Sequence, residues 1–233
     1  MQFEGKPLRH ELKYYINERE YESLRNRIRP IINLDQNADE NGNYHIRSLY
    51  FDDMYDSSLY EKNYGVFKRK KYRIRIYDFS TNIIKLECKS KFGEYISKDS
   101  VSLTLAEYNK IMDGDYDFLS NETGLKQEFY RRVIGGMLRP KVIVDYRREA
   151  YIYNPGDVRI TFDKELSVGY NSNDIFNKDL SSVGIFGEPT IILEVKFDEF
   201  LPQFIRGLLS ISSHERCAIS KYLMCRVKKN NIY

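Results

Sequence analysis

The sequence predicts an α+β protein in which a largely antiparallel sheet closes into an eight-stranded β-barrel with flanking helices. Three observations lead to this fold. Segments rich in β-branched and aromatic residues recur along the chain, which contains 20 tyrosines. Within these segments apolar and charged residues alternate, as they do in strands that bury one face. Closure into a barrel would also remove the exposed edges of so many strands.

At least eight segments carry the strand pattern. In chain order they span residues 9–16, 44–51, 71–79, 83–91, 94–101, 141–151, 158–163 and 190–198.

Helical spacing of apolar residues predicts helices between these strands. The first, over residues 18–29, follows Asn17 as an N-cap. The second, over residues 105–113, follows Thr104 and stops at Gly114, a residue that commonly ends helices. Further helices are expected over residues 122–134, 199–210 and 216–228.

The charge of the chain is nearly balanced, with 37 basic and 34 acidic residues in 233 and a net charge of +3. Bulk-electrostatic nucleic-acid binders usually carry a larger excess, so an anion site must be local. The N-terminal stretch lacks the apolar core of a signal peptide, and no apolar run approaches the roughly 18 residues of a membrane span. No linker or repeat divides the chain. We expect one domain over residues 1–233, soluble and cytoplasmic, without direct membrane insertion.

Cysteine and histidine spacing does not indicate a metal centre. The cysteines form no C-x-x-C pair, which favours reduced thiols over a disulfide or a zinc site. The histidines form no H-x-x-x-H pattern, so a His-based metal site is not expected. These residues are Cys88, Cys217, Cys225, His10, His45 and His214.

The polar faces of six predicted strands are unusually basic. On a single strand such a face is typical of a solvated surface with cross-strand ion pairs. Six strands with the same pattern favour a closed lumen lined by cations and a few carboxylates. The side chains that share these faces are Arg9, Glu11 and Lys13; Lys71, Arg73 and Arg75; Lys85, Glu87, Lys89 and Lys91; Tyr146 and Arg148; Arg159, Thr161 and Asp163; and Glu194 and Lys196.

A lumen of this kind cannot be dry, because unpaired buried charge is very costly. It would hold water, a metal ion and a polyanion. Arginine gives bidentate contacts to phosphate oxygens, whereas lysine acts as a point charge. The carboxylates would serve a phosphate ligand through a bridging divalent cation such as Mn²⁺ or Mg²⁺. RNA binding ranks last, since the chain has no aromatic-plus-basic RNA-binding pattern.

Eight short motifs occur in an order that resembles the triphosphate tunnel metalloenzymes of the CYTH-like superfamily, and within them the VTC domain of polyphosphate polymerases. The likeness runs through roughly residues 8 to 226. Each motif alone is common in strands, and the order of all eight is what makes the resemblance specific. They are ELKY (11–14), SLYFDD (48–53), YRIRIY (72–77), LECKSK (86–91), YRREAY (146–151), RITFD (159–163), LEVKF (193–197) and SKY (220–222).

This resemblance implies a role for each matching position. Glu194 matches the metal-binding glutamate, and Glu11 and Glu87 are secondary metal or network carboxylates. Lys221 matches a lysine that closes on the phosphate being transferred, with Arg148 and Arg159 as the other catalytic cations. Substrate-binding bases are expected at Lys13, Lys62 (at the tunnel mouth), Arg73, Arg75, Lys89, Arg148, Arg159 and Lys196.

Two of these positions also have plain structural interpretations. On helical spacing alone, Lys221 would be a surface lysine beside core residues. Glu194 could simply form an ion pair with Lys196 or a neighbouring arginine. The motif match and the basic surroundings favour the functional interpretation of both residues.

The first motif of this chain differs from that of the hydrolytic branch of the superfamily, and the difference helps to choose between the branches. Hydrolytic relatives typically open with E-x-E-x-K, where this chain has Arg9-His10-Glu11-Leu12-Lys13. Losing one carboxylate weakens a two-metal hydrolytic site and favours the polymerase-like branch. The resemblance therefore implies a metal-dependent enzyme that transfers the γ-phosphate of ATP to a growing polyphosphate chain.

Two alternatives stay open: an inorganic tripolyphosphatase or nucleoside triphosphatase, and a non-catalytic polyphosphate-binding module. The expected partners are ATP, inorganic triphosphate or polyphosphate, without nucleic acid. A separate membrane partner would be needed if the product is translocated.

Overall fold

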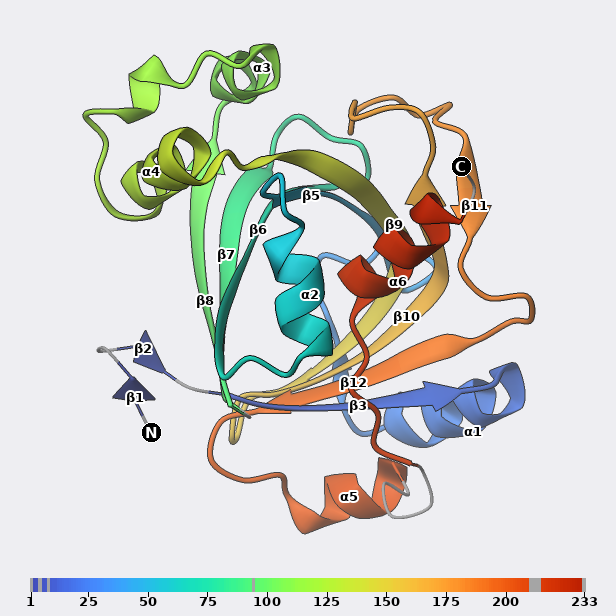
Figure 1. Cartoon of the computed structure of the whole chain (residues 1–233). Coiled ribbons are helices and arrows are strands. Elements are labelled where there is room, and N and C mark those ends of the chain that lie inside the picture. Colours follow the sequence, from blue (N-terminus) through green and yellow to red (C-terminus); the bar gives the residue numbers. More distant parts are fainter. Residues whose placement is uncertain (1, 4–5, 8, 94, 210–214, 232–233) are drawn as a thin grey trace.

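The computed structural model describes residues 2–3, 6–7, 9–93, 95–209 and 215–231. Its main feature is a curved antiparallel sheet (Figure 1). Eight long strands follow one another across it in the order β3-β12-β10-β9-β5-β6-β7-β8. They are β3 (His10–Ile16), β5 (Asn43–Asp52), β6 (Lys68–Tyr77), β7 (Ile84–Phe92), β8 (Tyr95–Leu103), β9 (Arg139–Tyr153), β10 (Val158–Gly169) and β12 (Ile191–Phe197).

Four short strands complete the described set. β4 (Asn33–Leu34) pairs with β9, and β11 (Ser182–Gly184) pairs with β10. β1 (Gln2–Phe3) and β2 (Lys6–Pro7) pair only with each other. The largest difference from the sequence prediction is β10, which continues past residue 163 through a register shift between Lys164 and Ser167.

The predicted closed eight-stranded barrel is corrected to a strongly curved open sheet. Its edge strands β3 and β8 meet at a single bridge among the described residues, where the Arg9 N–H donates to the Ile96 carbonyl at 3.3 Å. Arg9 directly precedes β3, and Ile96 is the second residue of β8. Antiparallel strands that meet at their first residues run apart in opposite directions, so no ladder of hydrogen bonds can follow.

The predicted helices are present, with changed bounds at the C-terminal end. α1 (Glu18–Ile28) and α3 (Leu105–Asp113) each begin with a capping box, at Asn17 and Thr104. α3 ends at Gly114, whose φ of 82° is the left-handed conformation that glycine adopts readily. The others are α4 (Gly124–Gly136), α5 (Gln203–Leu209) and α6 (Lys221–Asn230).

Two helical segments were not expected: α2 (Ser57–Asn63) and the 3₁₀ turn η1 (Asp117–Leu119). α6 begins five residues later than predicted, because Ser220 caps it: its hydroxyl accepts a hydrogen bond from the Leu223 N–H at 3.4 Å. No helix in the described part of the chain combines the length and apolar character needed to cross a bilayer.

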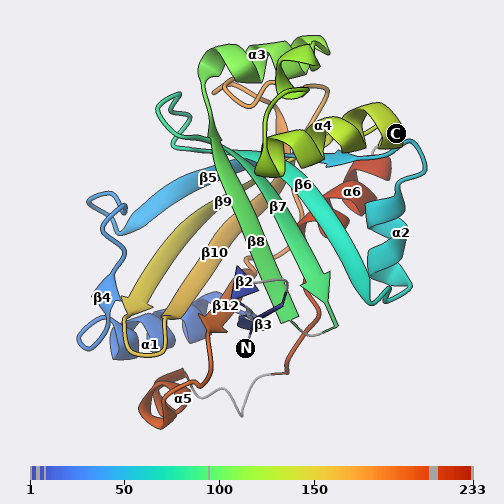
Figure 2. The same ribbon diagram turned by 90° about the vertical axis from the view of Figure 1, so that its left-hand side faces the viewer.

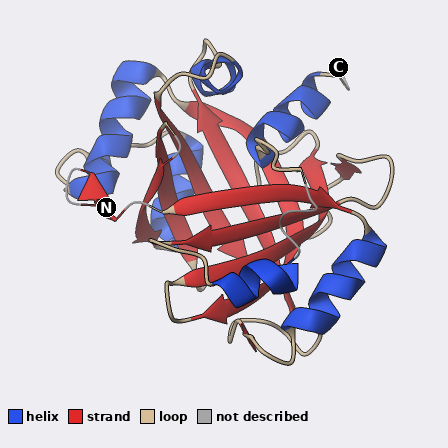
Figure 3. Ribbon diagram, turned by 90° about the horizontal axis from the view of Figure 1, so that it is seen from below, coloured by secondary structure: helices blue, strands red, loops and turns tan. Residues whose placement is uncertain are grey.

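Helices cover the convex side of the sheet in two groups (Figures 2 and 3). α3 and α4 pack on the outer face of β5 to β8, where Phe129 and Leu86 are fully buried. α1 and α5 pack on β3, β12 and β10, around Leu24 and Leu193.

The concave side is only partly filled by apolar side chains. α6 packs there through Tyr222 and Cys225, together with Ile219 just before the helix, against residues such as Val144 and Ile192. The described cysteines are all free thiols, as the sequence predicted. The rest of the concave face stays open and carries the charged residues.

Candidate functional site

The concave face of the sheet encloses a cavity of about 1080 Å³. Each of the eight long strands contributes to its wall, together with the first turn of α6. Of the described residues that line it, fourteen are Lys or Arg and three are Asp or Glu. A chain with a net charge of only +3 therefore concentrates its positive charge in one hollow, which favours a polyanionic ligand.

Strand register explains why these charges meet. Asp163 on β10 pairs directly with Arg148 on β9, and Glu194 on β12 pairs directly with Lys13 on β3. Directly paired residues in antiparallel strands point to the same face of the sheet. The alternation therefore places both carboxylates beside their cations on the concave face, where Glu194 lines the cavity and Asp163 is fully buried.

Three carboxylates stand on adjacent strands, and Glu194 lies between Glu11 and Asp163, so that its charge acts on both. Glu194 is 4% exposed. The Lys196 ammonium is 2.6 Å from Glu194 and 3.6 Å from Glu11. The Lys13 ammonium also bridges the pair, at 3.6 Å from Glu194 and 3.5 Å from Glu11.

Lys221 reaches the same carboxylates from α6. Its ammonium lies 2.5 Å from Asp163 and 3.8 Å from Glu194. The Lys13 ammonium donates to the Ile219 carbonyl at 3.3 Å, which fixes the chain just before the helix. Lys221 thus stands at the start of α6, directed into the cavity, rather than on an exposed helix face.

Ionisation in this cluster follows from the balance of burial and neighbouring charge. Burial opposes the charged form of Glu194, but Lys13 and Lys196 outweigh it and hold its pKa well below the usual value. Burial likewise opposes the charge on Lys13, yet Glu194 and Glu11 raise its pKa. Lys89 behaves differently: burial lowers its pKa to about 8, although Glu11 is 3.0 Å away.

A second set of cations lies on β6 and β8, around the carboxylate of Glu87 on β7. The buried Glu87 carboxylate accepts a hydrogen bond from Arg73 at 2.7 Å and another from Lys98 at 2.9 Å, and lies 3.7 Å from Arg75. Burial would raise the pKa of Glu87, but Arg73 and Arg75 hold it well below its usual range. The described contacts of Glu87 are therefore with cations, which it orients.

Arg148 and Tyr146 form the floor between the two sets. Asp163 accepts two hydrogen bonds from the Arg148 guanidinium, at 2.6 and 2.8 Å, and these hold its planar fork in place. The Tyr146 hydroxyl accepts a hydrogen bond from Arg75 at 3.2 Å. Burial would raise the pKa of Tyr146, but Arg148 and Arg75 outweigh it and lower that pKa.

Arg159 stands nearer the solvent, with its side chain 39% exposed. It donates hydrogen bonds to Asp35 at 2.6 Å and to the Tyr44 hydroxyl at 2.8 Å. Its Nε–H is buried and has no hydrogen-bond partner in the described part of the chain. Arg159 lines the cavity, so its partly exposed guanidinium can contact a ligand there.

The structure thus brings together most of the residues singled out in the sequence. Glu11, Glu194 and every predicted cation except Lys62 line the cavity. Lys62 belongs to α2, and its side chain lies outside the described residues. Glu87 contacts the β6 arginines, whereas Glu11 and Glu194 stand together on β3 and β12.

Sequence reasoning did not assign a role to several residues that complete the site. Asp163 was recognised on the same strand face as Arg159, but its contacts with Arg148 and Lys221 come from two other elements. The sequence signal for Asp163 was its position two residues after Thr161, which places both side chains on the same strand face. The further cavity residues that were not assigned roles include Tyr44, Lys98 and Arg216.

The carboxylates of the cavity suit a divalent cation only when phosphate oxygens and water complete its coordination. No group of three His, Cys, Asp or Glu side chains close enough to enclose a metal occurs among the described residues. Glu194 and Glu11 nevertheless offer hard oxygen ligands whose positions are held by ammonium groups. Mg²⁺ and similar ions often take one or two protein carboxylates and complete their coordination with substrate phosphates and water. The residues fit that mode of binding.

A curved antiparallel sheet with a cation-lined interior, entered by the first turn of a C-terminal helix, defines a protein of the triphosphate tunnel, or CYTH-like, class. The comparisons agree. The model of the VTC domain family matches residues 8–228, and the chain belongs to that family. No curated protein matches the sequence.

Solved structures of low sequence identity share the fold. A Bacillus halodurans protein described as a candidate adenylate cyclase is 14% identical, with a TM-score of 0.53, over 93% of this chain and 95% of its own. The PH1819 protein of Pyrococcus horikoshii OT3 is 15% identical, with a TM-score of 0.50, over 95% of this chain and 99% of its own. At this identity the likeness concerns the fold alone.

Proposed function

We propose that the protein is a polyphosphate polymerase-like phosphotransferase that moves the γ-phosphate of ATP onto a growing polyphosphate chain. The observation that carries this proposal is the cavity in which buried carboxylates hold arginines and lysines in fixed positions on several walls. Membership of the VTC domain family supports a triphosphate-containing substrate.

The cations have two separate tasks in this proposal. Arg73, Arg75, Arg148 and Arg159 bind phosphate oxygens along the chain, since guanidinium groups match two oxygens at once. Lys221 neutralises charge on the phosphate that is transferred. Catalysis of phosphoryl transfer requires little more than alignment and charge neutralisation, because the transition state is loose and its charge lies on the equatorial oxygens.

The transfer step is a direct exchange of one bond for another. A terminal oxygen of the bound polyphosphate forms a bond to the γ-phosphorus of ATP. The bond between that phosphorus and the β–γ bridging oxygen breaks, ADP leaves with the electron pair, and the chain gains one phosphate. When the attacking oxygen is already ionised it carries no proton to remove, so the protein does not need a general base.

A divalent cation would be held by Glu194, with Glu11 as a second carboxylate, and would supply further charge neutralisation between phosphate oxygens. Asp163 would position Arg148 and Lys221, because it contacts both cations directly. Glu87 would do the same for Arg73 and Arg75.

Incubation of the purified protein with ATP and Mn²⁺ or Mg²⁺, followed by gel separation, tests the proposal. We expect a ladder of polyphosphate products together with ADP. Chelation of the metal should abolish the ladder, and Glu194→Gln should lower its rate by at least about tenfold, since a metal-binding charge is lost. The matched control is Glu188→Gln, an exposed glutamate just before β12.

The other outcomes identify the alternatives. Release of free phosphate without a ladder would show a triphosphate hydrolase. Binding of triphosphate without turnover, with every metal tried, would show a non-catalytic module. Full activity of Glu194→Gln would contradict the metal assignment while leaving the polymerase proposal intact.

A further inference from the structure

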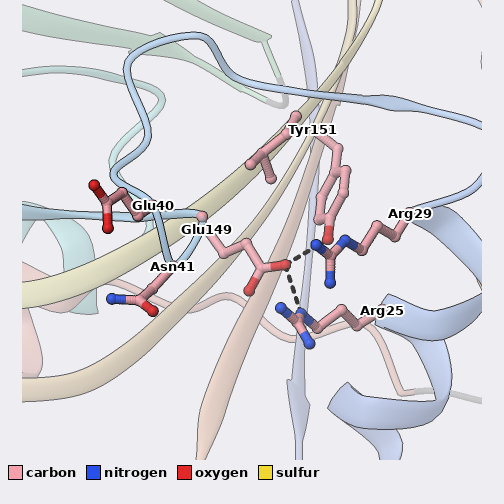
Figure 4. Close-up of a pocket in the computed structure, with 8 residues that line it drawn as sticks. Arg25, Arg29, Glu40, Asn41, Glu149 and Tyr151 are labelled. Carbon is pink, nitrogen blue, oxygen red and sulfur yellow. Dashed lines mark hydrogen bonds and ion pairs between the residues drawn. The ribbon is translucent and has the colours of Figure 1, made fainter.

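A second cavity lies on the convex side of the sheet, away from the charged interior. Its volume is about 250 Å³, and it is lined by α1, β9 and the segment that leads into β5. Figure 4 shows the polar side chains around it. Nothing in the proposed phosphotransfer uses this pocket.

The floor of this pocket is the buried carboxylate of Glu149, which is 1% exposed. It accepts hydrogen bonds from the hydroxyls of Tyr21 and Tyr151 and from the Arg25 Nε–H at 3.0 Å. The Lys164 ammonium is 3.5 Å away. Burial would raise the pKa of Glu149, but the Tyr151, Tyr21 and Arg25 hydrogen bonds lower it. The negative charge is thus fully engaged by the protein itself.

Two arginines beside Glu149, Arg25 and Arg29, have N–H groups that donate no hydrogen bond to the described residues. Arg25 lies in α1, and Arg29 lies one turn later at the C-cap of the helix. Both side chains point toward Glu149 (Figure 4). Arg25 contacts Glu149 through Nε, and no hydrogen bond of its Nη groups is found within the described ranges. The Arg29 side chain makes no hydrogen bond or ion pair with any described residue. Glu40 turns its carboxylate away from the pair (Figure 4).

The helix alone does not explain this arrangement. Cations near a helix C-terminus gain from the helix dipole, and Arg25, Arg27 and Arg29 all share that gain. Yet only Arg25 and Arg29 converge on the pocket, where like charges four residues apart destabilise each other. Glu149 offsets part of this repulsion, and a second anion between the two guanidinium groups would offset the rest.

We propose that this pocket binds a phosphate group through the guanidinium groups of Arg25 and Arg29. Two guanidinium forks suit an anion with three or more oxygens and more than one negative charge, which a carboxylate lacks. The same chemistry is offered by free orthophosphate and by the end of a short polyphosphate. This site is separate from the interior cavity and does not depend on the function proposed for it.

Phosphate titration of the full chain by calorimetry tests this site. The Arg73→Ala/Arg75→Ala background is expected to weaken binding in the interior, and within it the difference between the Arg29→Ala and Arg27→Ala proteins reports the outer pocket. Orthophosphate and tripolyphosphate are titrated in turn. Arg29→Ala should weaken binding by at least about tenfold, since a charge-assisted hydrogen bond to phosphate is lost. Arg27→Ala removes the same charge from the same helix and should leave the affinity unchanged.

Each possible result of the titrations either identifies the ligand or contradicts the proposal. Loss of orthophosphate binding in Arg29→Ala supports free phosphate as the ligand, and loss of tripolyphosphate binding alone supports a chain end. Equal affinities for Arg29→Ala and Arg27→Ala, with equal thermal unfolding, would overturn the proposal. So would the absence of binding of either phosphate to the Arg27→Ala protein. Arg29 is exposed, so its replacement should not disturb folding.

Discussion

Buried carboxylates determine the positions of the cations around them. Asp163 has no exposed surface in its side chain and receives both hydrogen bonds of the Arg148 fork. A guanidinium held in this way needs little rearrangement when a phosphate arrives, which is the advantage of a preorganised site. Removing such a carboxylate would leave its cations buried and unpaired, a change that is far costlier than losing a surface ion pair.

Lys89 should make triphosphate binding depend on pH. Its pKa of about 8 means that the ammonium is charged below this pH and neutral above it. A bound polyanion favours the charged form, so binding takes up a proton near pH 8. We expect the affinity for tripolyphosphate, measured by calorimetry, to fall as the pH rises from 7 to 9.

Lys89→Arg provides the control, because arginine stays charged throughout this range. Tripolyphosphate itself titrates here, but that effect is common to both proteins. The difference in slope therefore reports Lys89. The same pH profile for Lys89→Arg and the unmodified protein would contradict this prediction.

At the scale of elements, α6 and α2 form one unit that closes part of the concave side. The Tyr222 hydroxyl donates to the buried Asp52 carboxylate at 2.5 Å. Asp52 also accepts the backbone N–H groups of Ser58 and Leu59, at 2.9 and 3.3 Å, and so holds the first turn of α2. One carboxylate thereby joins both helices to the end of β5, and α6 carries Lys221 into the cavity.

Tyr222→Phe should lower the free energy of unfolding by about 1–3 kcal/mol, because it removes a hydrogen bond from a buried carboxylate. Denaturant unfolding measures the change. Tyr64→Phe is the matched control, since Tyr64 is 80% exposed and its replacement should have almost no effect. Amide exchange should also quicken in α6. Equal stability of the two variants would show that the Tyr222 hydroxyl does not hold α6.

At the scale of the whole molecule, the distribution of charge matters more than its sum. The excess of cations lies in the interior cavity, and the outer surface carries the balancing acids. Charges in a cavity with protein walls are screened less by salt than charges on an open surface, but binding of a polyanion still weakens as salt rises.

Arg73→Ala/Arg75→Ala should weaken tripolyphosphate binding by at least about tenfold at low ionic strength, and by less at high ionic strength. Affinity measured over a series of salt concentrations tests this. The control Arg131→Ala/Arg147→Ala removes two charges from the outside and should change affinity little. If both double variants lost affinity equally, net charge rather than the cavity would govern binding.

Much of the fold could be predicted because its signals are local. The strand alternation of β6, which places Arg73 and Arg75 on one face, depends only on the period of two along a strand. Capping at Asn17 and Thr104 depends on residues three apart. By contrast, α2 is a short helix over SSLYEKN with a left-handed residue, Asp56, before it, and it lacks a clear periodic signal. The single-domain and cytoplasmic expectations stay predictions.

The sequence by itself determined which side chains share a strand face, since that follows from alternation, and so it identified the set of interior bases. Only the tertiary structure decided which of them meet. Asp163 contacts both Arg148 on a neighbouring strand and Lys221, which lies 58 positions further along the chain. The sheet stays open because the offset between β3 and β8 leaves them with one bridge among the described residues. Such contacts depend on register and curvature across many strands, and no local pattern of residues encodes them.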